Sequence, residues 1–379
     1  MSTDLEREVE ELALIDHHVH GPLAGQTDDA TFQNLLTESD RPLAHGTSVF
    51  HSHLGMAIIN ECPEVLGLDG VRTPADYLRA RRDLPVAELT RTLLDASGVD
   101  EWLVDTGLGE SLLMDLPTMS TVTRGSVREI ARLETIAEKL VTTTTATGLH
   151  DAVIGHLDDL APMVAGWKSV IAYRHGFDFD PTRPSRSDVI TAAGRWMRAI
   201  ESGASPRVSD PVLLRMLLFA ACDTGLPVQL HAGYGDPDLD LHRSNPALLV
   251  DWLREVESSG SDIMLLHCYP YHREAGYLAH VFPHVYFDVG LAINYTGAAS
   301  TRVIAESMEL APFTKVLYSS DAYGPPELHY LGAQLWRRGT ARTLQSWIDD
   351  GGWSENDALR VARLIGRENA RRVYGEAHE

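Results

Sequence analysis

Short apolar runs rich in β-branched residues recur along the chain, and longer stretches with helical periodicity separate them. This alternation is typical of βα units, because strands buried in a parallel sheet read as nearly continuous apolar runs. Eight runs have the length and composition of such strands: residues 12–16, 101–106, 127–133, 167–173, 227–230, 262–266, 285–289 and 315–319. The run 127–133 reads equally well as the start of a helix. Eight strands that alternate with helices predict an α/β fold, a (β/α)8 TIM barrel.

The helical stretches have recognisable beginnings and ends. Residues 211–225 and 245–260 are amphipathic, and each closes with a glycine of the kind that ends helices. The longest interruption, residues 21–98, separates the first two predicted strands and holds local helical signals, such as a capping threonine before a proline at Thr73. We therefore expect a single barrel domain over residues 1–379, with 21–98 as a mainly helical insertion that covers the barrel mouth.

Charge and cysteine content indicate which kinds of binding partner and which cellular compartment to expect for the protein. The 379 residues carry a formal net charge of −22, which repels nucleic-acid phosphates and anionic membrane surfaces. The amino terminus lacks the basic start and apolar run of a signal peptide, and no apolar run reaches the roughly 18 residues of a membrane span. Cys62, Cys222 and Cys268 show no paired spacing. We expect a cytoplasmic protein with a small-molecule substrate and no nucleic-acid or membrane partner.

Polar residues with metal-binding chemistry stand at the ends of the predicted strands. They are Asp16, His18 and His20 after the first run, His231 after the fifth, His267 after the sixth and Asp321 after the eighth. Active sites of (β/α)8 barrels lie at this carboxyl-terminal edge. Alternate side chains of an extended segment share a face, so both histidines of the HxH pattern can hold one ion.

Each of these residues also has a purely structural interpretation. A single strand-end histidine is more often a hydrogen-bonded structural residue than a ligand, and an HxH pattern by itself is a weak signal. The joint pattern carries more weight, because four histidines and an aspartate all fall at strand ends of one predicted barrel.

The order DxHxH, a strand-end lysine, two strand-end histidines and a strand-end aspartate resembles the metal-dependent amidohydrolase superfamily. Within it, the segments GWKSVIAYRHG, VQLHAGYGDPDLDLHRSNP, LLHCYPYHREAGYLA and YSSDAYGPPE are similar to the amidohydrolase domain found fused to glutamine-synthetase-like domains. The resemblance extends from Asp16 to beyond Asp321. It implies a TIM barrel and one or two divalent metal ions. Zinc suits an imidazole-rich site, and manganese, iron and nickel are the alternatives.

The resemblance also implies roles for individual residues. His18, His20 and Asp321 would ligate the more buried metal, and Asp321 would take a proton from the attacking water. His231 would be a ligand whether one or two ions bind. His267 would either ligate a second ion or act as a hydrogen-bonding catalytic residue.

Two basic residues, one in the fourth run and one directly after it, have two possible assignments each. In binuclear members of the superfamily a lysine here is carboxylated and bridges two metals, which would be the role of Lys168; otherwise it is an amine packed in a polar barrel mouth. Arg174 follows the run directly and is a candidate catalytic-site residue that holds a substrate carboxylate in a bidentate fork. Its alternative is an internal ion pair.

Other polar residues near the strand ends have less specific assignments. Glu134, at the end of the third run, is a candidate to hydrogen-bond ligands or substrate. A second HxH, His51 and His53, falls inside the insertion, where substrate contact or loop structure is favoured over a metal site. The loop after the sixth run would line the barrel mouth with four polar residues: Tyr269, His272, Arg273 and Glu274.

The leading hypothesis is a metal-dependent hydrolase that uses activated water to cleave a small amide-type carbon–nitrogen bond, not a peptide bond. The fused-domain resemblance suggests γ-glutamyl or other amino-acid-derived amides. A metal-dependent decarboxylase of a small carboxylic acid is one alternative, and a catalytically silent binding or scaffold barrel is another. Hydrolysis releases an amine or ammonia, whereas decarboxylation releases CO2. Superfamily barrels often assemble, so we also expect a homo-oligomer.

Overall fold

The computed structural model describes residues 4–109 and 111–375. By their internal contacts, the residues of the chain form two compact units. Unit 1 contains Met1–Arg128 and Asp288–Glu379, and unit 2 contains Glu129–Phe287. The single-domain organisation expected from the sequence stays a prediction.

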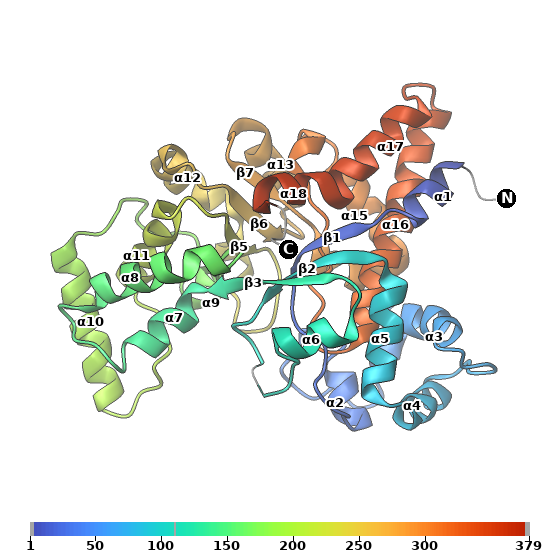
Figure 1. The fold of residues 1–379 in the computed structure, drawn as a ribbon, viewed down its shortest axis with the longest axis horizontal. Helices are drawn as coiled ribbons and strands as arrows, with labels where there is room; N and C mark the ends of the chain where they lie inside the picture. The colour runs from blue at the N-terminus through green and yellow to red at the C-terminus, as the bar shows by residue number, and fades with distance from the viewer. Residues whose placement is uncertain (1–3, 110, 376–379) are drawn as a thin grey trace. The chain divides into compact units, whose positions relative to one another are not determined.

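Seven parallel strands pair in the order of the chain, from β1 to β7 (Figure 1). Unit 1 holds the first two, β1 (Leu14–Val19) and β2 (Val99–Asp105). The boundary between the units falls within β3 (Ser126–Arg132). Unit 2 holds the last four, which are β4 (Gly166–Ser169), β5 (Val228–Ala232), β6 (Ile263–His267) and β7 (Val285–Phe287). Seven of the eight predicted runs are therefore confirmed as strands.

The segment predicted as the eighth strand, residues 315–319, is not a regular strand. A 3-10 turn covers Phe313–Lys315, and the chain beyond it runs beside β1 with irregular pairing. Backbone hydrogen bonds join the two segments from His17 N to Tyr318 O, at 3.3 Å, and from His20 N to Ala322 O, at 2.8 Å.

Two features directly after this segment keep the chain from continuing as a regular ladder. The N–H of Ser320 donates to the carboxylate of Asp16 at 3.0 Å rather than to a backbone carbonyl. Asp321 has a φ of 48°, in the left-handed region, which turns the chain out of the β conformation. Neither feature can be predicted from the apolar pattern of the run.

The fourth strand is shorter than its predicted run, 167–173. β4 ends at Ser169, and Ile171–Arg174 forms the one-turn helix α9. The N–H of Val170 donates to Oε1 of Glu134 at 3.0 Å, so a side chain takes the backbone donor that a longer strand would need for its ladder.

The segment between β1 and β2 is largely helical. Thr73 caps one of its helices as predicted, because its hydroxyl oxygen accepts the N–H of Asp76 at 3.2 Å. The placement of this segment over a barrel mouth stays a prediction. Its helices are α2 (Asp29–Asn34), α3 (His53–Val65), α4 (Pro74–Asp83) and α5 (Val86–Ser97).

The other helices of unit 1 come before and after the residues of unit 2 in the sequence. The longest element is α16, whose face toward the core is lined with buried residues. These helices are α1 (Asp4–Glu10), α6 (Leu116–Val122), α14 (Gly290–Thr296), α15 (Ser300–Ser307), α16 (Pro326–Asp349), α17 (Glu355–Arg363) and α18 (Asn369–Tyr374).

In unit 2, one helix is buried around its whole circumference. Every residue of α11 from Leu213 to Cys222 is buried, Arg215 included, and the helix packs against α7, α8 and α10 (Figure 1). This stretch therefore lacks the exposed face that the amphipathic interpretation of residues 211–225 predicts. The helices of this unit, besides α9, are α7 (Leu133–Leu140), α8 (Leu149–Leu160), α10 (Arg186–Glu201), α11 (Pro211–Asp223), α12 (Val250–Val256) and α13 (His272–Val281). Among the described helices of the chain, none has the length and apolar character needed to cross a bilayer.

Candidate metal centre

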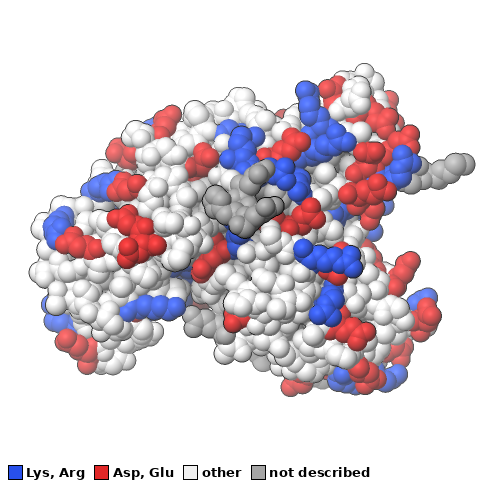
Figure 2. All heavy atoms as spheres, in the orientation of Figure 1, with Lys and Arg blue, Asp and Glu red and all other residues white. Residues whose placement is uncertain are grey.

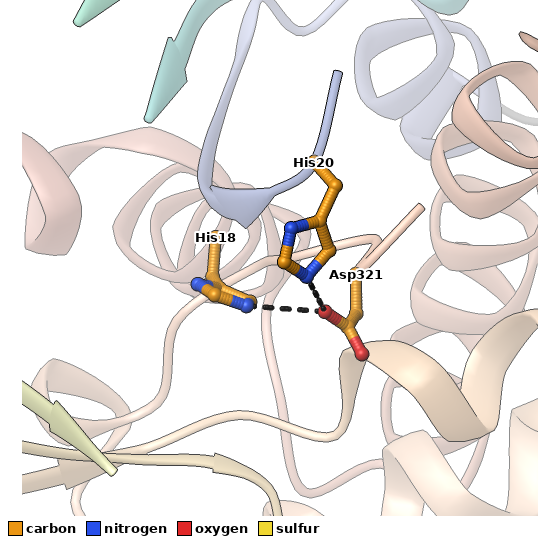
Figure 3. A group of neighbouring side chains, drawn as sticks. All are labelled: His18, His20 and Asp321. Atoms are coloured by element: carbon orange, nitrogen blue, oxygen red, sulfur yellow. Dashed lines mark ion pairs between the residues drawn. The ribbon is translucent and has the colours of Figure 1, made fainter. Parts of the chain in front are cut away.

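Unit 1 brings together three of the predicted ligands: His18, His20 and Asp321 (Figure 3). Their ligand atoms all lie within 4.8 Å of one another. Oδ1 of Asp321 lies 3.1 Å from Nε2 of His18 and 3.7 Å from Nε2 of His20. All three residues are buried.

The extended conformation of β1 aims both histidines at the aspartate. His18 and His20 are two residues apart, so their side chains leave the same face of the segment. Their rings stand nearly perpendicular, with centroids 5.3 Å apart. His17, which directly precedes His18, points the other way and contacts Asp288 and Tyr374. The prediction that the HxH pair converges on one point is consistent with this geometry.

A carbonyl group fixes the tautomer of His20. Its Nδ1 lies 3.1 Å from the backbone oxygen of Asp105, at the end of β2. A carbonyl oxygen can only accept, so Nδ1 carries the proton and Nε2 presents its lone pair toward Asp321. The backbone oxygen of His20 in turn accepts from Nε2 of the buried His329, at 2.9 Å. Partners of this kind hold a ligating imidazole in one orientation.

The aspartate is held by its backbone as well as by its neighbours. The N–H of Asp321 donates to the backbone oxygen of His18 at 3.2 Å, and its φ of 48° is unusual for a residue with a side chain. The nearby Asp16 accepts from Ser320, but burial outweighs that hydrogen bond and raises the pKa of Asp16 to about 8. The segment is thus fixed against β1 from several points.

The donor set fits a divalent transition metal. Two imidazole nitrogens and one carboxylate oxygen are the ligands of many catalytic zinc sites. Zinc bonds of about 2.1 Å in a tetrahedron place the ligand atoms about 3.4 Å apart. The two distances from Asp321 Oδ1, 3.1 and 3.7 Å, lie on either side of that value.

Unit 2 contains the other predicted ligands. The rings of His231 and His267 lie 4.7 Å apart between centroids, and Tyr173 lies 4.6 Å from His231 on another side. Nε2 of His231 lies 3.1 Å from the backbone oxygen of Tyr234, so this nitrogen donates in the present geometry. The assignment of these residues to the same centre as His18 stays a prediction.

The strand register explains which of these side chains share a face. Lys168 is paired with Gln229, which precedes His231 by two residues, so Lys168 and His231 project to the same side of the sheet. His267 is paired with Ala232 and by alternation would point the other way. Its φ of 68° breaks the alternation and lets its ring meet that of His231. Lys168 is buried, and its carboxylation stays untested.

Arg174 and Glu134 have internal partners. Nη2 of Arg174 lies 3.1 Å from Oε1 of Glu138, which is the ion pair of its alternative interpretation. Nη1 of the same arginine is buried without a hydrogen-bond partner among the described residues. Glu134 lies in the first turn of α7 instead of ending a strand, and it accepts from Ser169 Oγ at 2.6 Å and from Val170 N. It therefore fixes the end of β4, the strand that carries Lys168.

The remaining candidates do not all lie where the sequence placed them. His272, Arg273 and Glu274 form the first turn of α13, so they are not loop residues. The rings of Tyr269 and His272 stack with centroids 5.8 Å apart. His51 and His53 are exposed. Sequence analysis did not single out His17, Asp105, Asp288 or His329, although the acidic strand end at Asp105 was a usable signal.

Comparisons with known proteins agree with this geometry. The amidohydrolase family model matches residues 181–375. Protein fluG of Emericella nidulans is 28% identical over 95% of this chain, and the chain spans 45% of that relative's length. A crystal structure from Lactobacillus casei ATCC 334, provisionally assigned as a metal-dependent hydrolase, is 27% identical with a TM-score of 0.85 over 99% of this chain and 98% of that one.

A more distant likeness concerns the fold alone. The uronate isomerase of Bacillus halodurans C-125 is 14% identical, with a TM-score of 0.65 over 98% of this chain and 96% of that one. The family model covers more than half of the chain, and the histidine pair and aspartate of the superfamily pattern converge in unit 1. The chain therefore belongs to the amidohydrolase family.

Proposed function

We propose that the protein is a metal-dependent hydrolase that cleaves the carbon–nitrogen bond of a small amide. The observation that carries the proposal is the convergence of His18, His20 and Asp321 in unit 1, with ligand atoms within 4.8 Å. Family membership and the likeness to a provisionally assigned metal-dependent hydrolase support it. A divalent ion, with zinc as the first choice, would lower the pKa of a water molecule and polarise the substrate carbonyl.

The residues of the chain would hold the ion and move the proton. His18 and His20 contribute Nε2. The contact of His20 Nδ1 with the backbone oxygen of Asp105 keeps the lone pair of His20 Nε2 directed toward Asp321. Asp321 contributes Oδ1 to the centre, and its other carboxylate oxygen accepts a proton from the attacking water. The carbon–oxygen bond forms, the carbon–nitrogen bond breaks, and Asp321 returns the proton to the leaving nitrogen.

Further assignments complete the proposal. Lys168, His231 and His267 are additional candidate ligands, with His267 also a candidate for hydrogen bonding to substrate. Arg174 is the candidate for holding a substrate carboxylate, and its buried Nη1 supports that assignment. The resemblance of the sequence to amidohydrolase domains fused to glutamine-synthetase-like domains directs the substrate search first to γ-glutamyl and other amino-acid-derived amides.

Metal content and product identity test the function together. The purified protein is assayed for bound metal and then incubated with a panel of small amides and small carboxylic acids while amine, ammonia and CO2 are quantified. We expect metal-dependent release of amine or ammonia, lost in His18→Ala and retained in His156→Ala, which changes an exposed histidine on α8. Release of CO2 without amine would establish the decarboxylase instead. A folded protein that binds neither zinc nor manganese would leave only a binding or scaffold role.

A further inference from the structure

A buried carboxylate in unit 1 contacts both segments that carry the metal ligands. Asp288 has no exposed surface. Its Oδ2 lies 3.0 Å from Nε2 of His17, the neighbour of His18 on β1. Its Oδ1 accepts from the hydroxyl of Ser319 at 2.8 Å, two residues before Asp321. One side chain therefore bridges the segments of the histidines and of the aspartate.

One assignment of protons with an ionised Asp288 satisfies these contacts. An ionised carboxylate only accepts, so His17 donates from Nε2 and Ser319 donates from its hydroxyl. A neutral His17 then has a lone pair on Nδ1, which accepts from the hydroxyl of Tyr374 at 3.0 Å. The N–H of Gly290 also donates to Oδ1 of Asp288, at 2.7 Å. Charge-assisted hydrogen bonds of this kind are stronger than neutral ones and have narrow geometry.

The bridge acts where the backbone pairing is irregular. The segment that carries Asp321 forms no regular strand, and two of its backbone hydrogen bonds to β1 are 3.2 and 3.3 Å long. These are at the long end of the usual range for N–H to oxygen bonds. A third bond, from His20 N to Ala322 O, is 2.8 Å long. Side chains therefore add to an irregular backbone pairing, and Asp288 holds a residue on each segment.

Close packing around Ser319 shows that the bridge has little freedom. A Cβ atom on Gly290 would lie 2.0 Å from the hydroxyl oxygen of Ser319 and 2.8 Å from its carbonyl oxygen. Only a residue without a side chain fits there while Ser319 keeps its contact with Asp288. The serine thus has one place to lie, against the carboxylate.

We propose that Asp288 is a positioning residue for the metal centre: through His17 and Ser319 it sets the distance between His18 and Asp321. The inference rests on the proposed metal centre and adds to it a role for residues that touch no substrate. Outer partners of metal ligands commonly change affinity by 10- to 100-fold when they are removed. Asp288 acts one step further out, through the backbone of both ligand segments.

The test measures metal binding and ligand geometry rather than turnover. Zinc affinity is determined by competition with a chromophoric chelator, and the visible spectrum of the cobalt-substituted protein reports the ligand geometry. The variants are Asp288→Asn and Ser319→Ala. The matched control is Ser307→Ala, because Ser307 is also buried and its hydroxyl contacts only a carbonyl within α15, that of Ile304. Thermal melts of the metal-free proteins establish that each variant folds.

We expect zinc affinity to fall about tenfold in both bridge variants, with a shifted cobalt spectrum, and to be unchanged in the control. Should Asp288→Asn fail to fold, Ser319→Ala decides alone, since it removes one hydroxyl. Folded bridge variants with the affinity and cobalt spectrum of the unmodified protein would overturn the positioning role while the metal centre stands. An unmodified protein that binds neither metal would instead refute the proposed function.

Discussion

At the scale of single residues, two of the candidate ligands, His267 and Asp321, lie where the backbone leaves its ordinary conformations. Among the described residues other than glycine, positive φ occurs at His267, Cys268 and Asp321, at the ends of β6 and of the segment beside β1. Such conformations cost about 1–3 kcal/mol each and persist only where the surroundings enforce them. The strain redirects side chains that strand alternation would send elsewhere, which is how His267 comes to face His231.

The variant Asp321→Asn tests the left-handed backbone conformation and metal binding separately. Asn and Asp tolerate the left-handed region better than other residues with side chains, so we expect Asp321→Asn to keep the melting temperature of the metal-free protein. The neutral amide is a poorer ligand than a carboxylate, so zinc affinity should fall by at least tenfold. Thermal melts and zinc titration measure the two effects. An Asn variant that binds zinc as tightly as the unmodified protein would exclude Asp321 from the centre.

The buried Glu134 gives the stability of the protein a defined pH dependence. Burial raises the pKa of Glu134 above its ordinary value of 4.5, against the hydrogen bond from Ser169 that lowers it. The folded state therefore keeps a proton that the unfolded chain has released. The free energy of unfolding falls as pH rises from the unfolded pKa through the folded pKa, and this contribution is constant above it.

Replacing Glu134 with glutamine removes that titration and keeps an oxygen for Ser169 and Val170. The difference in unfolding free energy, Glu134→Gln minus unmodified, should increase with pH across this window and then level off. Urea denaturation at a series of pH values from 4.5 to 9 measures it. Glu255→Gln, on the exposed side of α12, is the control. A difference that does not vary with pH would show that Glu134 titrates alike in both states.

At the scale of elements, a buried ion pair joins α4 to the start of α16. Nε of Arg81 lies 2.6 Å from Oε1 of Glu327, and the hydroxyl of Tyr77 donates to the same oxygen at 2.9 Å. The guanidinium also lies 4.0 Å above the ring of Phe32. Glu327 stands six residues after Asp321, so this pair anchors the helix that follows the metal-binding segment.

Breaking this pair from one side should destabilise unit 1 strongly. Glu327→Leu leaves the charge of Arg81 buried without its carboxylate, for which we expect a loss of about 3–5 kcal/mol in the free energy of unfolding. The double variant Arg81→Met with Glu327→Leu removes both charges and should recover part of that loss. Urea denaturation compares the two, with Asp251→Asn in an exposed pair as control. A double variant less stable than the single one would contradict this reasoning.

The elements also show how far the sequence could be interpreted. Periodicity located seven strands, and capping chemistry located α4, because both depend on residues close together in the chain. Periodicity did not predict that the segment 315–319 is irregular or that β4 ends early. In both places a distant carboxylate, Asp16 or Glu134, takes a backbone N–H that a ladder would use. Bonds between distant residues leave no local pattern.

The candidate site, too, has a part that could be predicted from the sequence and a part that could not. His18, His20 and Asp321 could be predicted because strand ends and residue types are visible in sequence. Their supporting partners could not, since His17 and Asp288 are separated by 271 positions and only the fold brings them into contact. The ring contact between His231 and His267 depends on a backbone conformation that alternation would have excluded.

At the scale of the whole molecule, the face drawn in Figure 2 shows charge that is distributed rather than gathered. On the face drawn in Figure 2, Lys and Arg side chains lie beside Asp and Glu side chains. Exposed pairs such as Arg183 with Asp223, at 2.6 Å, contribute little to stability. The excess of acidic over basic residues, which gives a net charge of −22, acts over longer distances. At low ionic strength it attracts divalent cations and repels anionic substrates, and salt screens both effects.

Metal binding should stabilise the molecule unevenly, because the three clustered ligands all belong to unit 1. An ion that binds only the folded state raises the free energy of unfolding by about 2.7 kcal/mol when its free concentration is 100 times the dissociation constant. We expect zinc to raise the calorimetric transition in which unit 1 unfolds, and a chelator to reverse the shift. In Asp321→Asn the same zinc concentration should produce a smaller shift, whereas His156→Ala should respond fully. Zinc that binds without raising any transition would mean that the ion is held equally well by the unfolded chain, and the cluster of His18, His20 and Asp321 would then not be its site.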